Sequence, residues 1–156
     1  MTTNNITRLL DSRKIKYTAF ELPAEKLGAL ETAAQLNIPP EMVFKTIVVT
    51  QKAPGKPILA VVNARQEVDL KLVAQALKAK KVSLPTQDEA EALTGLQAGG
   101  ISPLALTNKP FLVLLDESSK AFEEIHISGG QRGLNIRLPV KDLIKLTKAR
   151  VAKIGE

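Results

Sequence analysis

The sequence predicts an α/β protein of the α+β type, in which helices surround a mixed, mostly antiparallel, barrel-like sheet. Three observations support this prediction. The chain has 156 residues, the usual size of a domain with its own core. Its strand-like segments are short and rich in β-branched residues. Helical and strand-like segments also follow one another without the regular βα alternation of a doubly wound sheet.

The first third of the chain is predicted to contain two helices and one strand. Residues 3–14 have the apolar spacing of an amphipathic helix, and Thr3 is the expected N-cap. A short strand is expected over residues 16–21. A short helix over residues 32–36 should end at Asn37-Ile38-Pro39-Pro40, because proline cannot continue a helix.

The middle third is predicted to form a hairpin followed by further helices. Residues 43–50 and 58–62 are rich in β-branched side chains and are separated by a segment containing Pro and Gly, which is typical of a turn. Asp69 is expected to cap the next helix. A short strand over residues 81–84 then precedes a capping box at residues 86–89, which opens a second helix.

The last third is predicted to be rich in strands. Strands are expected over residues 111–115, 124–127 and 134–138, with a closing helix that starts at Pro139. His126 is the only histidine, and it lies in an alternating stretch of the second strand. The period-2 pattern predicts that His126 faces solvent, so neither a catalytic triad nor a histidine metal site is expected.

The composition excludes several kinds of chemistry. The chain has no cysteine, which removes disulfides, thiolate zinc sites and cysteine nucleophiles. Aromatic residues make up 3% of the chain, so the core must be aliphatic. No stretch approaches the roughly 20 apolar residues that span a bilayer, and the N-terminus lacks the pattern of a signal peptide. We therefore expect a cytoplasmic protein that uses no metal and no cofactor.

The formal net charge of +6 favours a polyanionic partner such as tRNA. The basic residues are spread along the chain, with one cluster near the C-terminus: Lys141, Lys145, Lys148, Arg150 and Lys153. The scarcity of aromatic side chains argues against a surface that stacks bases.

Lys45 is the first candidate functional residue. It lies in the most hydrophobic predicted strand, where alternation places it on the same face as Val43, Ile47 and Val49. An ammonium group in such a strand either reaches solvent along its own aliphatic stem or meets an anion. Both interpretations remain open on this feature alone, the anion being a phosphate or a carboxylate.

Two glycine-rich segments are the other candidates. Residues 95–103 contain Gly99-Gly100 followed by Ser102-Pro103, and residues 128–133 contain three glycines and Arg132. Adjacent glycines leave main-chain N–H groups uncovered, and such groups can bind an anion or a polarised carbonyl. Each segment could equally be a loop or a hairpin turn with no ligand. Neither matches a phosphate-binding P-loop or a dinucleotide-binding fingerprint, and Ser102 lacks the flanking glycines of a hydrolase serine.

Together, three segments resemble the YbaK/EbsC family of trans-editing aminoacyl-tRNA deacylases, which is related to the editing domain of bacterial prolyl-tRNA synthetases. They are Val43-Phe44-Lys45-Thr46, Gly95-Leu96-Gln97-Ala98-Gly99-Gly100-Ile101-Ser102-Pro103-Leu104 and Ser128-Gly129-Gly130-Gln131-Arg132-Gly133-Leu134. Their order and spacing match the family over nearly the whole chain. The resemblance implies one domain over residues 1–156, with a barrel-like sheet and surrounding helices.

The resemblance also assigns roles to residues. It implies that Lys45 is functionally essential and that the first glycine loop lines the aminoacyl site. The implied catalytic residues are Lys45, Gly99 and Gly100. The implied substrate-binding residues are Phe44, Thr46, Ser102, Pro103, Ser128, Gly129 and Gly130.

The implied reaction is cleavage of the ester that joins a wrong amino acid to tRNA, as in cysteinyl-tRNA(Pro), with no metal or cofactor. The implied partners are the tRNA acceptor end and prolyl-tRNA synthetase. Residues 22–30 and Leu96 differ from the best-known cysteine-specific members, so alanine, serine and threonine are competing substrates. The remaining alternatives are a non-catalytic module that binds tRNA or a synthetase, and a protein that binds a small phosphate or carboxylate metabolite.

Overall fold

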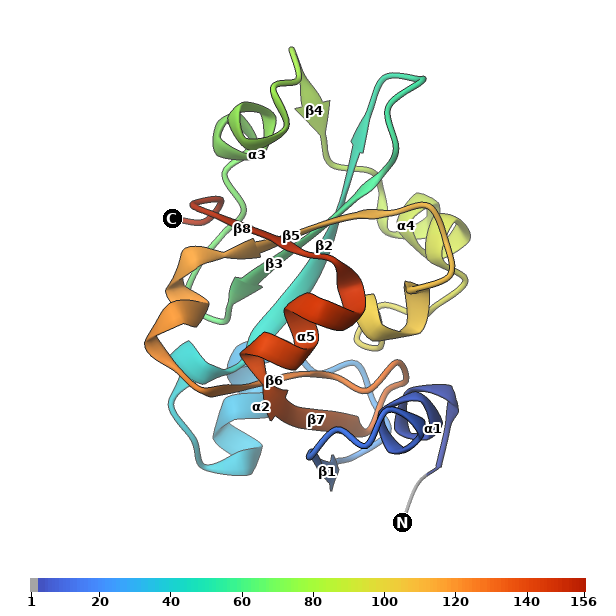
Figure 1. Ribbon diagram of the computed structural model, residues 1–156, viewed down its shortest axis with the longest axis vertical. Helices are drawn as coiled ribbons and strands as arrows, with labels where there is room; N and C mark the ends of the chain where they lie inside the picture. Colours follow the sequence, from blue (N-terminus) through green and yellow to red (C-terminus); the bar gives the residue numbers. More distant parts are fainter. Residues whose placement is uncertain (1–2) are drawn as a thin grey trace.

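The computed structural model describes residues 3–156, and these fold into two sheets with helices around them (Figure 1). The strands are β1 (Thr18–Glu21), β2 (Phe44–Gln51), β3 (Ile58–Asn63), β4 (Val82–Ser83), β5 (Leu112–Asp116), β6 (Glu124–Ser128), β7 (Leu134–Pro139) and β8 (Arg150–Ala152). The α-helices are α1 (Asn5–Ser12), α2 (Ala29–Leu36), α3 (Leu70–Leu77), α4 (Gln87–Thr94) and α5 (Val140–Thr147). Short 3-10 helices occur at η1 (Pro40–Met42), η2 (Pro103–Leu106) and η3 (Glu117–Ala121).

The pairing of the strands confirms the α+β class and corrects one detail of it. One sheet has the order β1-β7-β6 and the other β4-β2-β3-β5-β8. Pairing is antiparallel except between β3 and β5 and between β5 and β8, which are parallel. The described strands therefore form two open sheets, and the expected barrel closure is not present.

Among the described residues the two sheets are joined by one β-bridge, and their strands diverge beyond it. Val43, just before β2, forms an isolated parallel bridge with His126 of β6. Beyond this bridge no pairing between β2 and β6 continues. Figure 1 shows β2 rising from this point towards the top of the molecule while β6 runs across its lower part. The divergence of these two strands opens a space between the sheets.

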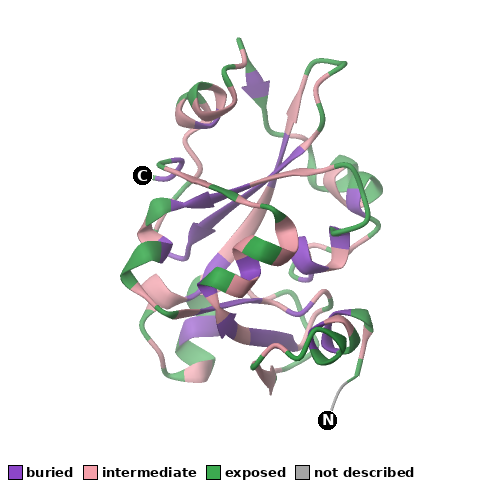
Figure 2. Ribbon diagram, in the orientation of Figure 1, coloured by how far each residue is buried: buried purple, intermediate pink, exposed green. Residues whose placement is uncertain are grey.

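The core is aliphatic, as the composition predicts. All six residues of β3 are buried, because this strand lies between two neighbours in the larger sheet. Figure 2 shows that the central strands of both sheets are buried along most of their length, whereas exposed residues concentrate on helices and turns. Two large clusters of buried side chains form, one around Leu115 and Ile136 and the other around Ile58 and Val73.

Several predicted elements change at their ends. Helix α1 is capped by Asn4, whose side chain accepts from the Thr7 amide, and not by Thr3. Helix α2 begins three residues earlier than predicted, because the Glu31 side chain accepts from the Gly28 amide and caps the first turn. Strand β8 was not predicted, since three residues are too few to carry a recognisable alternation.

The solvent-facing position predicted for His126 is wrong. The residue is only 1% exposed, and its neighbours Ile125 and Ile127 are fully buried as well. Strand β6 lies close to the junction of the two sheets, where both of its faces are covered. Phe20 of β1 lies over the imidazole with ring centroids 5.4 Å apart. The period-2 rule fails here because it presumes one solvated face.

Candidate active site

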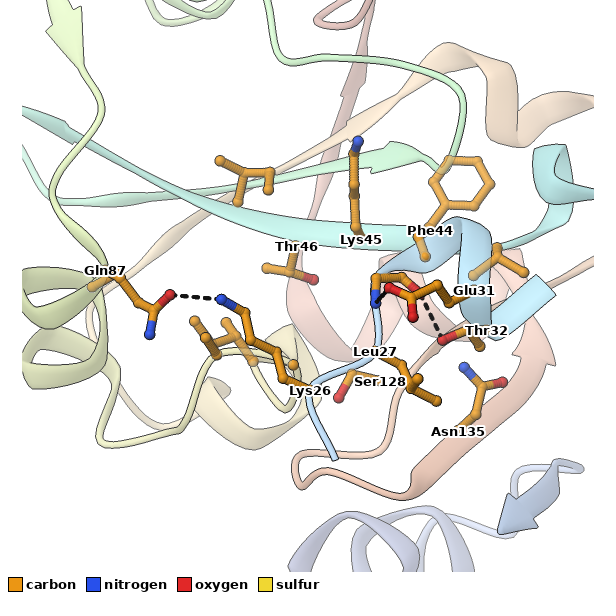
Figure 3. Close-up of a pocket in the computed structure, with 18 of the residues that line it drawn as sticks. Lys26, Leu27, Glu31, Thr32, Phe44, Lys45, Thr46, Gln87, Ser128 and Asn135 are labelled. Carbon is orange, nitrogen blue, oxygen red and sulfur yellow. Dashed lines mark hydrogen bonds between the residues drawn. The ribbon is translucent and has the colours of Figure 1, made fainter. Parts of the chain in front are cut away.

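A cavity of about 580 Å³ occupies the space where β2 and β6 diverge. Its walls come from segments far apart in the sequence: residues 22–29, β2, residues 84–87, both glycine segments and the start of β7. Figure 3 shows these segments converging on the cavity. Most of its lining side chains are apolar, including Leu27, Phe44, Val48, Ile101 and Leu134.

Three adjacent residues of β2 from the predicted site line this cavity: Phe44, Lys45 and Thr46. The Nζ of Lys45 lies 3.5 Å from the Oε1 of Glu67, which is 91% exposed. In Figure 3 the Lys45 side chain extends to the opposite side of β2 from Lys26 and Ser128. Because the partner carboxylate is so exposed, the ion pair is weak and an incoming anion can replace it.

In the first glycine segment, Gly99 lines the cavity and Gly100 does not. The Gly100 amide donates to Gln97 O at 2.8 Å, and the Ala98 amide donates to Glu91 Oε2 at 2.7 Å. Gly99 has no hydrogen-bond partner among residues 3–156. The amide of Ile101, which also lines the cavity, has no acceptor among residues 3–156 either, so Gly99 and Ile101 carry the main-chain donors that this loop can offer a ligand.

Ser102 and Pro103 lie behind the wall of the cavity and not on it. Both are buried, and Ser102 is 0% exposed. The Ser102 hydroxyl accepts from the Leu104 amide at 3.3 Å, which caps the short helix η2. The structure therefore places this pair where it supports the loop from within.

In the second glycine segment, Ser128 lines the cavity, whereas Gly129 and Gly130 do not. The Ser128 hydroxyl accepts from the Gly130 amide at 3.2 Å, and the Gly129 amide donates to Leu134 O at 2.8 Å. These hydrogen bonds shape the turn that joins β6 to β7. Their effect is to hold Ser128 at the cavity.

Hydrogen bonds between distant segments hold both glycine segments in place. The Arg132 Nε donates to Ala98 O at 2.8 Å, which joins the second segment to the first. The Leu22 amide donates to Gly133 O at 2.9 Å. The N-cap residue Asn4 also donates from its side chain to Gly129 O at 2.8 Å. The cavity is thus formed before any ligand arrives.

Lys26 and Gln87 at the cavity were not identified from the sequence. The Lys26 Nζ donates to Gln87 Oε1 at 2.8 Å, so it links residues 22–29 to helix α4 (Figure 3). Both residues line the cavity, and both are exposed. No local motif marks either residue, because the contact joins positions 61 residues apart.

Asn135 is a further cavity residue that the sequence did not indicate. It is 4% exposed, and its Oδ1 lies 2.8 Å from the Nδ1 of His126. Burial lowers the pKa of His126, and the charge of Arg137 adds to this effect, although the hydrogen bond to Asn135 acts in the opposite direction. The imidazole behind the cavity wall is therefore kept neutral.

Comparison with known proteins identifies the family. Residues 24–146 match the model of the aminoacyl-tRNA editing domain. An Enterococcus faecalis protein described as a candidate Cys-tRNA(Pro)/Cys-tRNA(Cys) deacylase, EbsC, is 34% identical over 152 residues, or 96% of this chain and 92% of the relative. The chain belongs to the aminoacyl-tRNA editing domain family.

Solved structures agree with this assignment. A protein described as a candidate trans-editing enzyme for prolyl-tRNA synthetase superposes with a TM-score of 0.81 at 26% identity, covering 100% of this chain and 99% of the other. The hypothetical protein APE2540 has the same fold, with a TM-score of 0.89 at 20% identity, covering 98% of this chain and 100% of the other.

Family membership confirms the expected resemblance and the expected enzyme class, an aminoacyl-tRNA deacylase. The matched region, residues 24–146, contains every segment that lines the cavity apart from Leu22. Among residues 3–156, no helix is long and apolar enough to cross a membrane.

Proposed function

We propose that this protein is a trans-editing deacylase that removes cysteine from mischarged tRNA(Pro) in the cytoplasm. The observation that supports this most directly is the cavity itself. It is preformed, mostly apolar and bordered by two glycine segments that hydrogen bonds hold in place, and the amide of Gly99 has no acceptor within residues 3–156. A small aminoacyl group fits such a site, and the larger tRNA remains outside.

The position of Lys45 suits the nucleotide part of the substrate. Its amine lies across β2 from the glycine segments, and its ion-pair partner in the described part of the chain is the exposed Glu67. With the aminoacyl group in the cavity, the terminal adenosine crosses the edge of β2 and brings its phosphate to Lys45. The phosphate then replaces the Glu67 carboxylate as the partner of the ammonium group.

The chemical step needs no enzyme nucleophile, because an aminoacyl ester is already activated. In the proposed step, the cysteine thiol of the substrate attacks its own ester carbonyl. The new S–C bond replaces the C–O bond, the thiol proton passes to the departing ribose oxygen, and the products are a thiolactone and uncharged tRNA. The Gly99 amide donates to the carbonyl oxygen as negative charge develops there.

The experiment that tests this function is a panel of tRNA(Pro) charged with cysteine, alanine, serine or threonine. We expect turnover of the cysteinyl ester to exceed the others. Faster turnover of alanyl-, seryl- or threonyl-tRNA would reassign the substrate within the same activity. If none of the four were deacylated, the chain would be a non-catalytic module that binds tRNA or prolyl-tRNA synthetase.

Lys45→Ala provides the matching residue test. Loss of the phosphate partner should lower kcat/KM for cysteinyl-tRNA(Pro) about 100-fold, the usual order for one well-placed charge contact. The control is Lys52→Ala, at an exposed position in the β2–β3 turn that does not line the cavity, and it should retain full activity. Equal activity of both variants would contradict the role assigned to Lys45.

A further inference from the structure

The edge of β2 that borders the cavity has unpaired main-chain groups. On one side β2 pairs with β3 along its length, from Phe44 to Val49. On the other side it pairs with β4 only at Thr50 and Gln51. Its only other neighbour on that side is β6, through the bridge at Val43. The stretch from Phe44 to Val48, all of which lines the cavity, has no strand beside it.

The hydrogen-bond register shows which groups face the cavity. Ala64 donates its amide to Val43 O at 2.8 Å, so the main chain of Val43 faces β3. In an antiparallel pair, alternate residues direct both N–H and C=O to the same neighbour. Ile47 and Val49 therefore also face β3, whereas Thr46 and Val48 direct their N–H and C=O groups into the cavity. No residue in the range 3–156 hydrogen-bonds to these groups of Thr46.

The same reasoning applies to β6 on the opposite side of the gap. The Gly129 amide donates to Leu134 O at 2.8 Å, which places the main chain of Gly129 towards β7. Ser128, one residue earlier, therefore directs its N–H and C=O groups away from β7, towards β2. Ser128 also lines the cavity. Two strand edges thus face each other across it, at Thr46 and at Ser128.

The gap between these edges is short. It begins at the Val43–His126 bridge and ends where β4 joins β2 at Thr50. The seven-residue step from Val43 to Thr50 spans about 23 Å of extended chain, and strand pairing at both ends confines the gap to this stretch. A single aminoacyl group is short enough to lie within this stretch, between Thr46 on one side and Ser128 on the other.

We propose that the aminoacyl part of the substrate continues the interrupted ladder between β2 and β6. The α-ammonium group donates to a main-chain carbonyl at one edge, and the ester carbonyl accepts from the amide of Thr46, which adds a second donor to that of Gly99. The protein therefore recognises the α-amino ester through main-chain groups, and the side chain of the amino acid is selected separately by the apolar wall. This inference rests on the proposed function.

Hydrogen exchange of the amides of β2 tests the inference directly. The probe is a non-hydrolysable substrate analogue, cysteine joined by an amide bond to 3'-amino-3'-deoxyadenosine. Without it, the amides of Thr46 and Val48 should exchange faster than those of Ile47 and Val49, which are bonded to β3. With saturating analogue, exchange at Thr46 should slow at least tenfold, while Ile47 and Val49 should not change.

A matched chemical substitution tests the same group in the reaction. Replacing the peptide N–H of Thr46 by an ester oxygen removes the donor and keeps the side chain. This should lower kcat/KM about tenfold without lowering Tm, because the donor has no partner in the free protein. The control is the same replacement at Val49, whose amide faces β3 and which does not line the cavity; there Tm should fall and kcat/KM should be retained.

The possible outcomes separate this inference from the proposed function. If the analogue binds and the protein deacylates cysteinyl-tRNA, but exchange at Thr46 does not slow, the ladder is refuted and the function stands. An analogue in which hydrogen replaces the α-amino group should bind at least tenfold more weakly, and equal binding would refute the role of the edge carbonyls. If the protein neither binds the analogue nor deacylates any of the four tRNAs, both proposals fail.

Discussion

At the scale of single residues, some main-chain amides at the cavity donate to acceptors within the protein, and others are left for a ligand. The amide of Gly100, predicted to be catalytic, is bonded to Gln97 O, whereas the amide of its neighbour Gly99 has no partner among the described residues. The sequence marked the glycine pair as one candidate, and the structure places Gly99 but not Gly100 at the cavity. The sequence alone could not show that the Gly100 amide is bonded and the Gly99 amide is not. That difference depends on the turn in which the Gly100 amide donates to Gln97 O.

The buried His126 predicts a pH dependence of stability. Burial lowers the pKa of its imidazole below the ordinary value of 6.5. As the pH falls through about 6.5, the imidazole therefore takes up a proton in the unfolded chain but stays neutral in the folded protein. The free energy of unfolding should be highest above pH 6.5 and should fall below it, by up to about 1.4 kcal/mol per pH unit.

Urea unfolding between pH 5 and pH 8 measures this effect. The variant His126→Gln lacks the titrating group, so the part of the slope that arises near pH 6.5 should disappear. The same slope in both proteins would show that the imidazole is not responsible. Asn135 should remain a neighbour of residue 126 in the variant, since the two positions are diagonal across the β6–β7 pair, where residue 126 is opposite Arg137 and Asn135 is opposite Ser128.

At the scale of elements, the turns that bring distant segments together have the least tolerance for change. Gly133 has a φ of +87°, and a Cβ there would lie 3.0 Å from Leu22 O and 3.2 Å from the Cα of Ala24. Any side chain at this position pushes residues 22–24 away from the β6–β7 turn. The same residues begin the segment that covers the cavity.

Gly133→Ala should therefore destabilise the protein more than an alanine at a glycine with open surroundings. The matched control is Gly95→Ala at the end of α4, where φ is +73° and the nearest atom to a new Cβ is the Lys109 Nζ at 3.6 Å. The control should cost about 1 to 2 kcal/mol for backbone strain alone, and Gly133→Ala roughly twice as much. Urea unfolding measures both, and equal losses would contradict the close approach to Leu22.

Most elements could be predicted from the sequence, because local signals determine them. The β2–β3 hairpin, the helix capped by Asp69 and the capping box at Thr86 all form as predicted. The meeting of β2 with β6 could not be predicted, since it joins segments more than 80 residues apart. The cavity arises from that meeting, which is why no local pattern marked Lys26, Gln87 and Asn135 as cavity residues.

At the scale of the whole molecule, Asp116 ties the C-terminal segment to the larger sheet. Its Oδ1 accepts from the amides of Ile154 and Gly155 at 2.9 and 3.0 Å, and its Oδ2 from Gln66 and the Ser118 amide, both at 3.0 Å. Burial raises the pKa of this carboxyl, but the hydrogen bonds from Ile154, Ser118 and Gln66 outweigh it, and the pKa is lowered overall.

Asp116→Ala should lower the free energy of unfolding at pH 7 by about 3 kcal/mol, because it leaves buried amides without an acceptor. The lowered pKa means that the carboxylate contributes fully above pH 3.8 and loses its contribution as the pH falls through its folded value. The difference between variant and parent in urea should thus shrink below pH 3.8. A difference that stays constant down to pH 2 would contradict this account.

The positive charge of the molecule predicts how tRNA binding responds to salt. With a net charge of +6, the protein should bind the tRNA acceptor end less tightly as the salt concentration rises. In a plot of the logarithm of the binding constant against the logarithm of the salt concentration, each phosphate contacted on a single strand should contribute a slope of about −0.7. Lys45→Ala should reduce the slope by about that amount, and Lys52→Ala should leave it unchanged. Titrations from 50 to 300 mM salt would show whether Lys45 contacts a phosphate; an unaltered slope for Lys45→Ala would exclude it.

The open edge of β2 also bears on whether other chains can pair with the protein. An unpaired strand edge on a protein surface is a template on which other chains can add as extra strands and begin to aggregate. Here the edge lies inside a cavity whose walls include residues 22–29 and 84–87, and the adjoining strands close it at both ends. The walls that define the proposed substrate site therefore also cover a strand edge on which another chain could otherwise add.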